Sequence, residues 1–268
     1  MFHFLNMQKN TKWRCRIAPS LGALEGTPAE VWGTLPYGDK YDPTVFFGLY
    51  GLPDFYTLWG HRGKKYILWA GSDIRHLIGG YWLDDSEWGA KLPPEPIANW
   101  ISRNCESWVE NKVEAEALRK LGIESKVCPS FMGDVNNFPV SEKRIEKRYY
   151  SSVSSNDFEL YGWAKINKIA EQNPDIGYHL YGNTVEWKAP KNVIVHGKVP
   201  KEIMNGEIKS MTGAIRLVDF DGCSELVVKA VLMGQEVISA IDYPFLHAKN
   251  PREELLKTLN KFPWNTKI

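Results

Sequence analysis

The turn at residues 219–225, with the sequence DFDGCSE, contains the small residues Gly222, Cys223 and Ser224, which suit a phosphate-binding loop. The apolar run Ile215–Val218 precedes it, and apolar residues at helical spacing follow it from Leu226 to Met233. At the start of a helix, backbone N–H groups and the positive end of the helix dipole favour an anion. The sequence therefore predicts a phosphate-binding site made of Asp221, Gly222, Cys223, Ser224 and Glu225.

The segments around this turn predict a β-α-β unit. Gly234 occupies the position of a C-cap glycine, and the β-branched run 236–240 predicts the strand that follows the helix. Two strands joined by a helix are parallel, and ligands of open parallel sheets bind at the carboxyl ends of the strands. The turn follows such an end, so we expect the function of the protein to depend on it.

The first half of the chain also has the succession of strand, small-residue turn and helix. The apolar run 44–48 predicts one strand, the run 66–70 predicts the next, and a helix follows each. The residues after these strands are predicted to line a ligand-binding cleft, and they are Gly48, Tyr50, Gly51, Ser72, Asp73 and His76.

Asp73 and His76 are the candidate catalytic residues of this set. A carboxylate or an imidazole can act as a general base. Each also has an alternative without catalysis: Asp73 can cap the helix that begins beside it, and His76 can be a partly exposed helical residue.

A polar run at residues 133–148 predicts a domain boundary. It contains Pro139 and shows no apolar period, whereas strands and helices alternate on both sides of it. We therefore predict an α/β protein with an N-terminal domain at residues 1–135 and a C-terminal domain at residues 136–268.

Composition argues against several classes of protein. The 268 residues include 33 Lys and Arg against 32 Asp and Glu, and a formal net charge of +1 gives no general attraction to nucleic acid or membranes. The four cysteines lack metal-ligand spacing and are too few for a disulfide scaffold, which suggests free thiols in a reducing compartment. We expect a cytoplasmic protein without a signal peptide or a membrane span.

The second half of the chain resembles the C-terminal domain of GT-B-fold nucleotide-sugar glycosyltransferases, most closely the retaining type. The resemblance rests on a strand ending in Gly182, the segment VIVHGKVPKEIMNGEIKSM (193–211), and the DG-x-S turn with its helix, glycine and EVIS strand. The segment VENKVEAEALRKLGIESKVCPSF (109–131) looks like the last part of their N-terminal domain. Roughly residues 45–245 are covered. The resemblance implies two Rossmann-like domains with parallel sheets that face each other across a cleft, the N-terminal one reduced.

The resemblance also implies an activity and its substrates. A sugar would move from a nucleoside-diphosphate donor, UDP- or GDP-linked, to a glycan, a lipid-linked sugar or a small molecule. A nucleobase, and hence DNA, is a less favoured acceptor. No metal or other cofactor is expected. The C-terminal domain would bind the donor, with Gly182, Asn183, Gly197 and Arg216 beside the turn, and the N-terminal domain would bind the acceptor through Gly48, Tyr50, Gly51 and Ser72. Whether the transfer retains or inverts configuration stays open.

The chain departs from the pattern of the family at Lys229. Many retaining members carry two glutamates separated by seven residues, and the second binds the donor ribose. Asp221 and Lys229 occupy the matching positions here. A lysine cannot accept hydrogen bonds from ribose hydroxyls. Glu225 lies one helical turn earlier and can replace the missing carboxylate or pair with Lys229.

Other functions are compatible with the same residues. Lys229 favours a non-catalytic nucleotide- or sugar-binding module or subunit as the alternative. Asp219-x-Asp221 also resembles the metal-binding pair of GT-A enzymes, but only 47 residues follow Asp221. The sequence VDFDGCSEL (218–226) resembles the nucleophile motif of haloacid-dehalogenase-type phosphatases, without the later acidic pair that such enzymes need.

Overall fold

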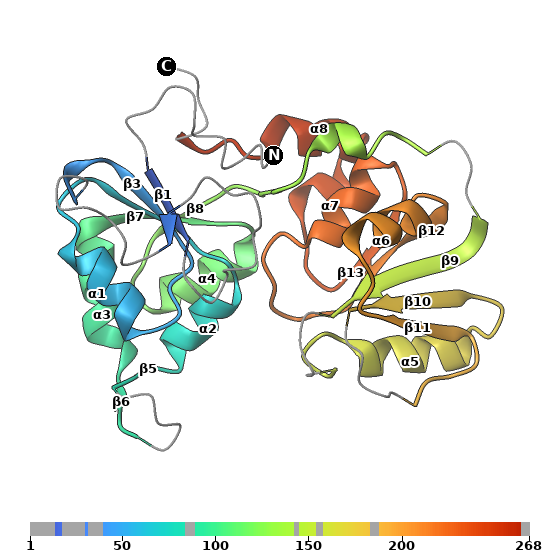
Figure 1. Ribbon diagram of the computed structural model, residues 1–268, viewed down its shortest axis with the longest axis horizontal. Helices are drawn as coiled ribbons and strands as arrows, with labels where there is room; N and C mark the ends of the chain where they lie inside the picture. The colour runs from blue at the N-terminus through green and yellow to red at the C-terminus, as the bar shows by residue number, and fades with distance from the viewer. Residues whose placement is uncertain are drawn as a thin grey trace. The chain divides into compact units, whose positions relative to one another are not determined.

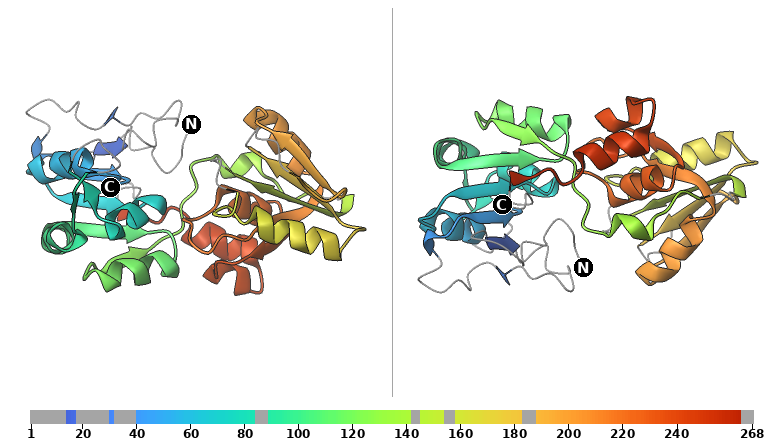
Figure 2. Two further views of the ribbon diagram at one scale, coloured as in Figure 1. Left: turned by 90° about the horizontal axis from the view of Figure 1, so that it is seen from below. Right: turned by 90° about the horizontal axis from the view of Figure 1, so that it is seen from above.

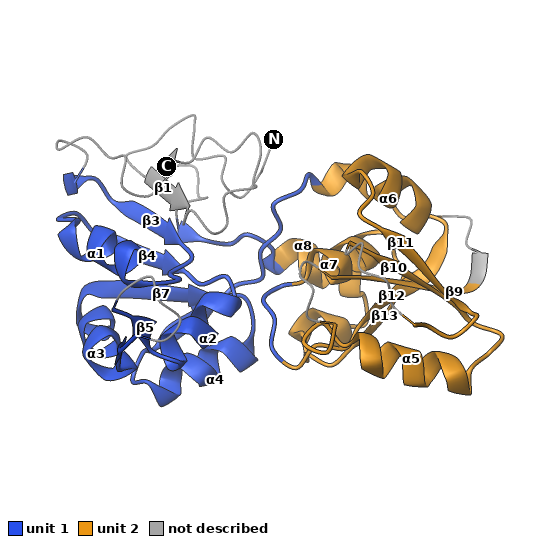
Figure 3. Ribbon diagram, turned by 60° about the horizontal axis from the view of Figure 1, so that its bottom comes forward, with its two compact units in different colours: residues 1–134, 220–223, 258–268 blue, residues 135–219, 224–257 orange. Residues whose placement is uncertain are grey.

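The structure, a computed structural model, describes residues 14–17, 30–31, 40–83, 89–141, 145–153, 158–182 and 188–263. Its contacts divide the chain into two compact units (Figure 3). Unit 1 contains residues 1–134, 220–223 and 258–268, and unit 2 contains residues 135–219 and 224–257. Each unit has a parallel sheet with helices beside it (Figure 1), and Figure 2 shows both units from two further sides.

In the described part of unit 1, six parallel strands form a sheet with the order β2-β1-β3-β4-β7-β8. The strands are β1 (Arg14–Ile17), β2 (Glu30–Val31), β3 (Thr44–Phe47), β4 (Lys65–Leu68), β7 (Cys105–Val109) and β8 (Ser125–Val127). The helices are α1 (Leu52–Gly60), α2 (Ser72–Ile78), α3 (Pro94–Asn104) and α4 (Lys112–Lys120). An antiparallel pair follows α2 and consists of β5 (Tyr81–Trp82) and β6 (Lys91–Leu92).

One hydrophobic core joins this sheet to helices α1–α4. In α3, Ile97 and Ile101 lie one turn apart on the buried face, as a 3.6-residue period requires, and they belong to the same core as Phe46 and Val109 of the sheet. All four residues of β3 are buried, which is typical of a parallel strand covered on both faces. The continuous apolar run in the sequence therefore corresponds to a central strand.

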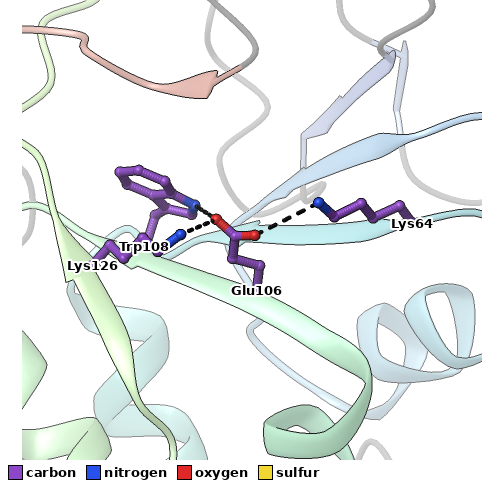
Figure 4. Close-up of polar contacts among 4 residues, drawn as sticks. All are labelled: Lys64, Glu106, Trp108 and Lys126. Carbon is purple, nitrogen blue, oxygen red and sulfur yellow. Dashed lines mark hydrogen bonds and ion pairs between the residues drawn. The ribbon is translucent and has the colours of Figure 1, made fainter.

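Polar side chains from β7 and β8 and from beside β4 contact one another (Figure 4). Glu106 accepts hydrogen bonds from Trp108 Nε1 at 3.1 Å and from Lys126 Nζ at 2.8 Å, and its other oxygen lies 3.8 Å from Lys64 Nζ. Both lysine side chains are 62% exposed, so water screens each pair and limits its contribution to about 1 kcal/mol.

The end of the chain belongs to unit 1. The Asn260 side chain accepts from the Phe131 N–H and donates to the Phe131 carbonyl, both at 2.9 Å, and the Phe262 ring lies 5.7 Å from the Trp108 ring. The sequence placed residues 220–223 and 258–268 in the C-terminal domain, whereas their contacts assign them to unit 1. These segments are too short and too polar for a periodic pattern to indicate which sheet they join.

In the described part of unit 2, five parallel strands form a sheet with the order β11-β10-β9-β12-β13. The strands are β9 (Ile145–Ser152), β10 (Gly177–Tyr181), β11 (Val193–Gly197), β12 (Met211–Arg216) and β13 (Glu236–Ser239). The helices are α5 (Trp163–Gln172), α6 (Lys201–Ile208), α7 (Glu225–Leu232) and α8 (Pro251–Thr258), with 3₁₀ turns at Val135–Asn137 and Pro244–His247.

Gln235 connects several elements of unit 2. Its amide nitrogen donates to the Ile208 and Met211 carbonyls at 2.8 and 2.9 Å, and its oxygen accepts from the Tyr150 hydroxyl at 2.8 Å. These groups are buried, so each would lose a hydrogen bond without Gln235. The side chain thereby fixes the end of α6 and the start of β12 against β9.

Strand β12 begins four residues earlier than the sequence predicts. The apolar run starts at Ile215, but the ladder already includes Met211 and Gly213. Gly213 lacks a side chain because the Glu236 carbonyl of β13 lies against it: a Cβ there would be 2.2 Å from that oxygen. A glycine in a strand weakens the apolar pattern, and close packing of two main chains requires it here.

No helix in the described ranges combines the length and the hydropathy that a membrane crossing needs.

Two glycines of unit 2 test this packing. We expect Gly213→Ala to destabilise the protein by about 1–3 kcal/mol, because the methyl group collides with the main chain of β13. Gly206→Ala is the control: this helical glycine has no neighbouring atom within 4 Å of an added Cβ, so alanine should stabilise α6 by about 0.5–1 kcal/mol. Urea unfolding curves of both variants measure the difference. Equal stabilities would contradict the β12–β13 pairing.

Candidate functional site

Asp73 is a buried carboxylate that binds main-chain N–H groups. Its oxygens accept from Leu49 at 3.0 Å, Ala70 at 3.0 Å and Ile74 at 2.9 Å, and the side chain is 0% exposed. Burial raises its pKa to about 7, although these hydrogen bonds favour the ionised form. Asp73 thus ties the loops after β3 and β4 to the first turn of α2. An inaccessible, fully engaged carboxylate cannot serve as a substrate base, which corrects the prediction of a catalytic role.

Tyr50, Ser72 and His76 come together at the same end of the sheet. The Ser72 hydroxyl donates to the Tyr50 hydroxyl at 3.3 Å, and the Tyr50 and His76 rings meet edge-on with centroids 5.5 Å apart. Gly48 and Gly51 belong to the same loop, where the Gly48 N–H donates to the Leu68 carbonyl at 3.0 Å.

His76 is the member of this group that can exchange protons with a ligand. Its side chain is exposed. Partial desolvation, followed by the charge of Arg75, lowers its pKa, so the imidazole is neutral at pH 7. A neutral, exposed imidazole is able to accept a proton.

Two further buried carboxylates follow β7, and neither was predicted from the sequence to belong to a site. Asn111 is the N-cap of α4 and accepts from the Glu114 N–H at 3.1 Å, while Glu114 Oε2 accepts from the Glu110 N–H at 2.8 Å. Burial raises the pKa of Glu110 and of Glu114. The pattern Asn111-x-x-Glu114 before an amphipathic helix is a capping-box signature, which is the signal that could have identified Glu114.

The turn at residues 220–223 lies against these carboxylates. Glu110 Oε2 accepts from the Cys223 N–H at 2.7 Å, and Glu110 Oε1 accepts from the Ser130 hydroxyl. The Asn111 amide donates to the Asp221 carbonyl at 2.6 Å, and the Gly222 N–H donates to Asp221 Oδ1 at 3.1 Å. The amides of Gly222 and Cys223, predicted to hold a phosphate, thus bind carboxyl groups of the protein.

Glycine is required at two positions for the turn to lie this close to Glu110 and to the loop after β4. A Cβ at Gly222 would lie 2.0 Å from Glu110 Oε2. A Cβ at Gly71 would lie 3.0 Å from the Gly222 nitrogen, and Gly71 also has a φ of +90°. The main chains of residues 71 and 222 are therefore close because neither residue has a side chain.

In unit 2, Glu225 and Lys229 form an ion pair at the start of α7. Lys229 Nζ lies 3.2 Å from Glu225 Oε2, and Lys201 Nζ lies 3.5 Å from the same oxygen. The Lys229 side chain is 2% exposed, and its ammonium group lies 5.5 Å from the centre of the Phe138 ring. Of the two predicted possibilities, the structure shows Glu225 paired with Lys229.

The charges of this pair depend on one another. Burial alone would raise the pKa of Glu225, but Lys229 and then Lys201 lower it. Burial lowers the pKa of Lys229, and Glu225 opposes that effect. Glu225 therefore stays ionised at neutral pH although it is partly desolvated. Ser224, the N-cap of α7, donates its N–H to the Tyr243 hydroxyl at 3.4 Å.

Arg216 contacts its own unit. It is 7% exposed, donates from Nη1 to the Ser152 carbonyl at 2.6 Å, and its guanidinium carbon lies 5.1 Å from the centre of the Tyr161 ring. These contacts give the guanidinium a structural role in joining β9 and β12, and they oppose the prediction that Arg216 binds a donor phosphate.

The two predicted strand-end glycines of unit 2 lie together. The Gly182 N–H donates to the Gly197 carbonyl at 2.8 Å. Gly182 has a φ of +115°, and a Cβ there would lie 2.0 Å from the Val153 carbonyl oxygen. Asn183 falls outside the described residues. Elsewhere in unit 2, Asp219 forms an ion pair with Lys165 at 2.7 Å. Across the ranges that the structure describes, no three His, Cys, Asp or Glu side chains are grouped to hold a metal ion.

Asp73→Asn tests the structural role of Asp73. The amide group presents N–H toward a main-chain N–H, so one buried donor loses its acceptor, at a cost of about 1–3 kcal/mol. Burial raises the folded-state pKa of Asp73 to about 7 from its usual 3.8, so its contribution to stability is complete at acid pH and is lost as pH rises through 7. Between acidic and alkaline pH, the thermal midpoint should fall less for the variant than for the parent protein. A variant with the thermal midpoints of the parent protein at both pH values would contradict the structural role of Asp73.

Of the comparisons with known proteins, the one with solved structures identifies the fold. No protein-family model and no curated protein matches this sequence. Among solved structures, the chain is similar to TarM, with a TM-score of 0.52 and 12% identity over 80% of this chain and 46% of TarM. It is also similar to sucrose-phosphate synthase from Thermosynechococcus elongatus, with a TM-score of 0.54 and 11% identity over 76% of this chain and 56% of that enzyme.

The chain spans about half the length of these two proteins. At such low identities the similarity concerns the fold alone. The predicted α/β class with parallel sheets is confirmed. The chain has the GT-B fold of nucleotide-sugar glycosyltransferases.

Proposed function

We propose that the chain is a glycosyltransferase that binds a nucleoside-diphosphate sugar and transfers the sugar to a hydroxyl acceptor. The observation that carries the proposal is the ionised Glu225 held by Lys229 and Lys201 at the start of α7, in a chain with the GT-B fold. A UDP- or a GDP-linked donor suits this arrangement, and the proposed transfer needs no metal or other cofactor. We further propose a cytoplasmic location.

Glu225 is proposed to bind the donor ribose. Its side chain is 38% exposed, so a ligand can reach it, and the lysine contacts involve Oε2. An ionised carboxylate accepts hydrogen bonds from two adjacent hydroxyls, which Lys229 at the family position cannot do. In this proposal Lys229 is a positioning residue that keeps Glu225 ionised. Lys201, with a side chain 52% exposed, can approach the donor phosphate.

The N–H groups at the start of α7 are proposed to stabilise the leaving diphosphate. Negative charge grows on the phosphate as its bond to the sugar breaks, and preorganised N–H groups lower the energy of that state. The residues concerned are Gly222, Cys223, Ser224 and Glu225. Gly182, Gly197 and Asn183 remain proposed neighbours of the donor.

The acceptor is proposed to bind unit 1 beside Tyr50, Ser72 and His76, with Gly48 and Gly51 as close main-chain contacts. His76 is the proposed general base, since it is exposed and neutral at pH 7. A glycan, a lipid-linked sugar or another hydroxyl compound fits this chemistry. DNA is the less favoured acceptor because the net charge is only +1.

A non-catalytic nucleotide-binding module is the second candidate. The buried Lys229 favours it, because a lysine stands where the catalytic members of the family bind ribose with a carboxylate. Nucleotide binding without turnover distinguishes this module from the enzyme.

Glu225→Ala tests the donor site. A hydrogen bond to a charged group contributes about 1.5–3 kcal/mol, so the affinity for UDP or GDP should fall about tenfold to a hundredfold, as calorimetry can measure. Glu253→Ala is the matched control, because Glu253 forms the same i,i+4 pair with Lys257 on exposed helix α8. The double variant Glu225→Ala/Lys229→Met removes both charges of the pair, so that the buried Lys229 is not left unpaired, and it separates lost binding from a destabilised fold. Parent-like affinity in both variants would exclude Glu225 from the donor site.

His76→Ala tests the catalytic role. Loss of a general base should lower kcat about 100-fold or more while nucleotide affinity stays unchanged. Transfer and donor hydrolysis with a panel of UDP- and GDP-sugars provide the assay, and His247→Ala, an exposed histidine of unit 2, is the control. A parent-like kcat would remove His76 from the mechanism. A parent protein that binds nucleotide but turns over no donor would favour the non-catalytic module.

A further inference from the structure

A carboxyl group of the protein occupies a main-chain N–H that is predicted to bind the donor phosphate. The Cys223 N–H donates to Glu110 Oε2 at 2.7 Å, and both residues belong to unit 1. Carboxylate and phosphate oxygens are the same kind of acceptor for a main-chain N–H. The Cys223 N–H can therefore bind either the Glu110 carboxyl group or the diphosphate.

We propose that Glu110 is a built-in competitor of the donor diphosphate and couples nucleotide binding to the uptake of a proton. The inference rests on the proposed function and concerns the regulation of its donor site. When the diphosphate takes the Cys223 N–H above the pKa of Glu110, a proton from solvent binds to the ionised Glu110 carboxylate. One negative charge arrives at the turn while another is neutralised there.

The geometry holds Glu110 in the competing position. The Ser130 hydroxyl donates to Oε1, and the Glu110 N–H donates to Glu114 Oε2 at 2.8 Å. A Cβ at Gly222 would lie 2.0 Å from Glu110 Oε2, so the carboxyl group abuts the main chain of the turn. A diphosphate at the same N–H would lie next to this carboxylate, where low solvent exposure strengthens the repulsion of like charges.

The surroundings of Glu110 favour the protonated form. Burial is the main cause that raises its pKa, and nearby carboxylates add to it. Glu114 is 0% exposed, and its Oε1 has no hydrogen-bond partner in the described structure, so a carboxylic O–H in this cluster would supply a donor that is missing. The titratable groups around Glu110 are Tyr50 after β3, Asp73 of α2, Glu114 of α4, Cys128 after β8, and Asp221 and Cys223 of the turn.

The affinity for nucleotide should depend on pH in one direction. Below its raised pKa, Glu110 is neutral and does not oppose the diphosphate. Above that pKa it is ionised, and binding must be accompanied by protonation. Nucleotide affinity should therefore fall as pH rises, by at most about tenfold per pH unit for one proton.

Calorimetry with UDP and with GDP tests this between about pH 7 and 9, above the pKa of about 6 expected for a terminal phosphate. Buffers with different ionisation enthalpies give the number of protons bound with the nucleotide. We expect the parent protein to take up a proton, approaching one per nucleotide at the alkaline end. Glu110→Gln keeps the shape but not the charge, so its proton uptake should disappear and its affinity at alkaline pH should rise about tenfold.

Two further variants make the result specific. Glu106→Gln neutralises a half-buried carboxylate of β7 that pairs with Lys126, and it should behave as the parent does (Figure 4). Ser130→Ala removes the hydroxyl that favours the ionised form of Glu110, so it should strengthen binding in the same direction as Glu110→Gln even if the latter folds poorly. Nucleotide binding by the parent with unchanged proton uptake and affinity in Glu110→Gln and Ser130→Ala would overturn this inference alone. No nucleotide binding by any of the proteins would overturn the proposed function and the inference together.

Discussion

The structure of unit 1 depends on the need to pair buried carboxylates with main-chain N–H groups. Asp73 accepts from three N–H groups after β3 and β4, and Glu114 accepts from the Glu110 N–H after β7. Glu110 in turn accepts from the Cys223 N–H. An ionised carboxylate without such partners is costly to bury, so these contacts determine where the loops at the carboxyl ends of the strands lie. Glycine at positions 71 and 222 makes the close approach of the main chains possible.

The same chemistry connects the fold to the proposed function. N–H groups at the start of a helix attract an anion, and in this protein the Cys223 N–H binds a carboxyl group of the chain. In unit 2, two ammonium groups keep Glu225 ionised although it is partly buried. Lys229 therefore has a clear physical role in the absence of the carboxylate seen at its position in the resembling enzymes. In the proposed function, the nucleotide competes with protein groups for partners that are already paired.

The sequence was informative where the signals are local. Alternating apolar runs and helical periods predicted both parallel sheets, and the turn before α7 was recognised from its small residues. Two errors have local causes: Gly213 interrupted the apolar pattern of β12, and Asp73 was interpreted as accessible because its burial depends on the Leu49 loop. Glu110 was missed for a different reason, since its partner Cys223 is 113 residues away and no single-sequence pattern relates them.

A crystal structure of the protein with UDP would show whether the diphosphate displaces Glu110 from the Cys223 N–H. We expect a phosphate oxygen at hydrogen-bond distance, about 2.7–3.2 Å, from the Cys223 nitrogen, with the Glu110 carboxyl group no longer accepting from that N–H. The ribose hydroxyls should meet the Glu225 carboxylate. A nucleotide bound elsewhere, with Glu110 still accepting from the Cys223 N–H, would contradict this expectation.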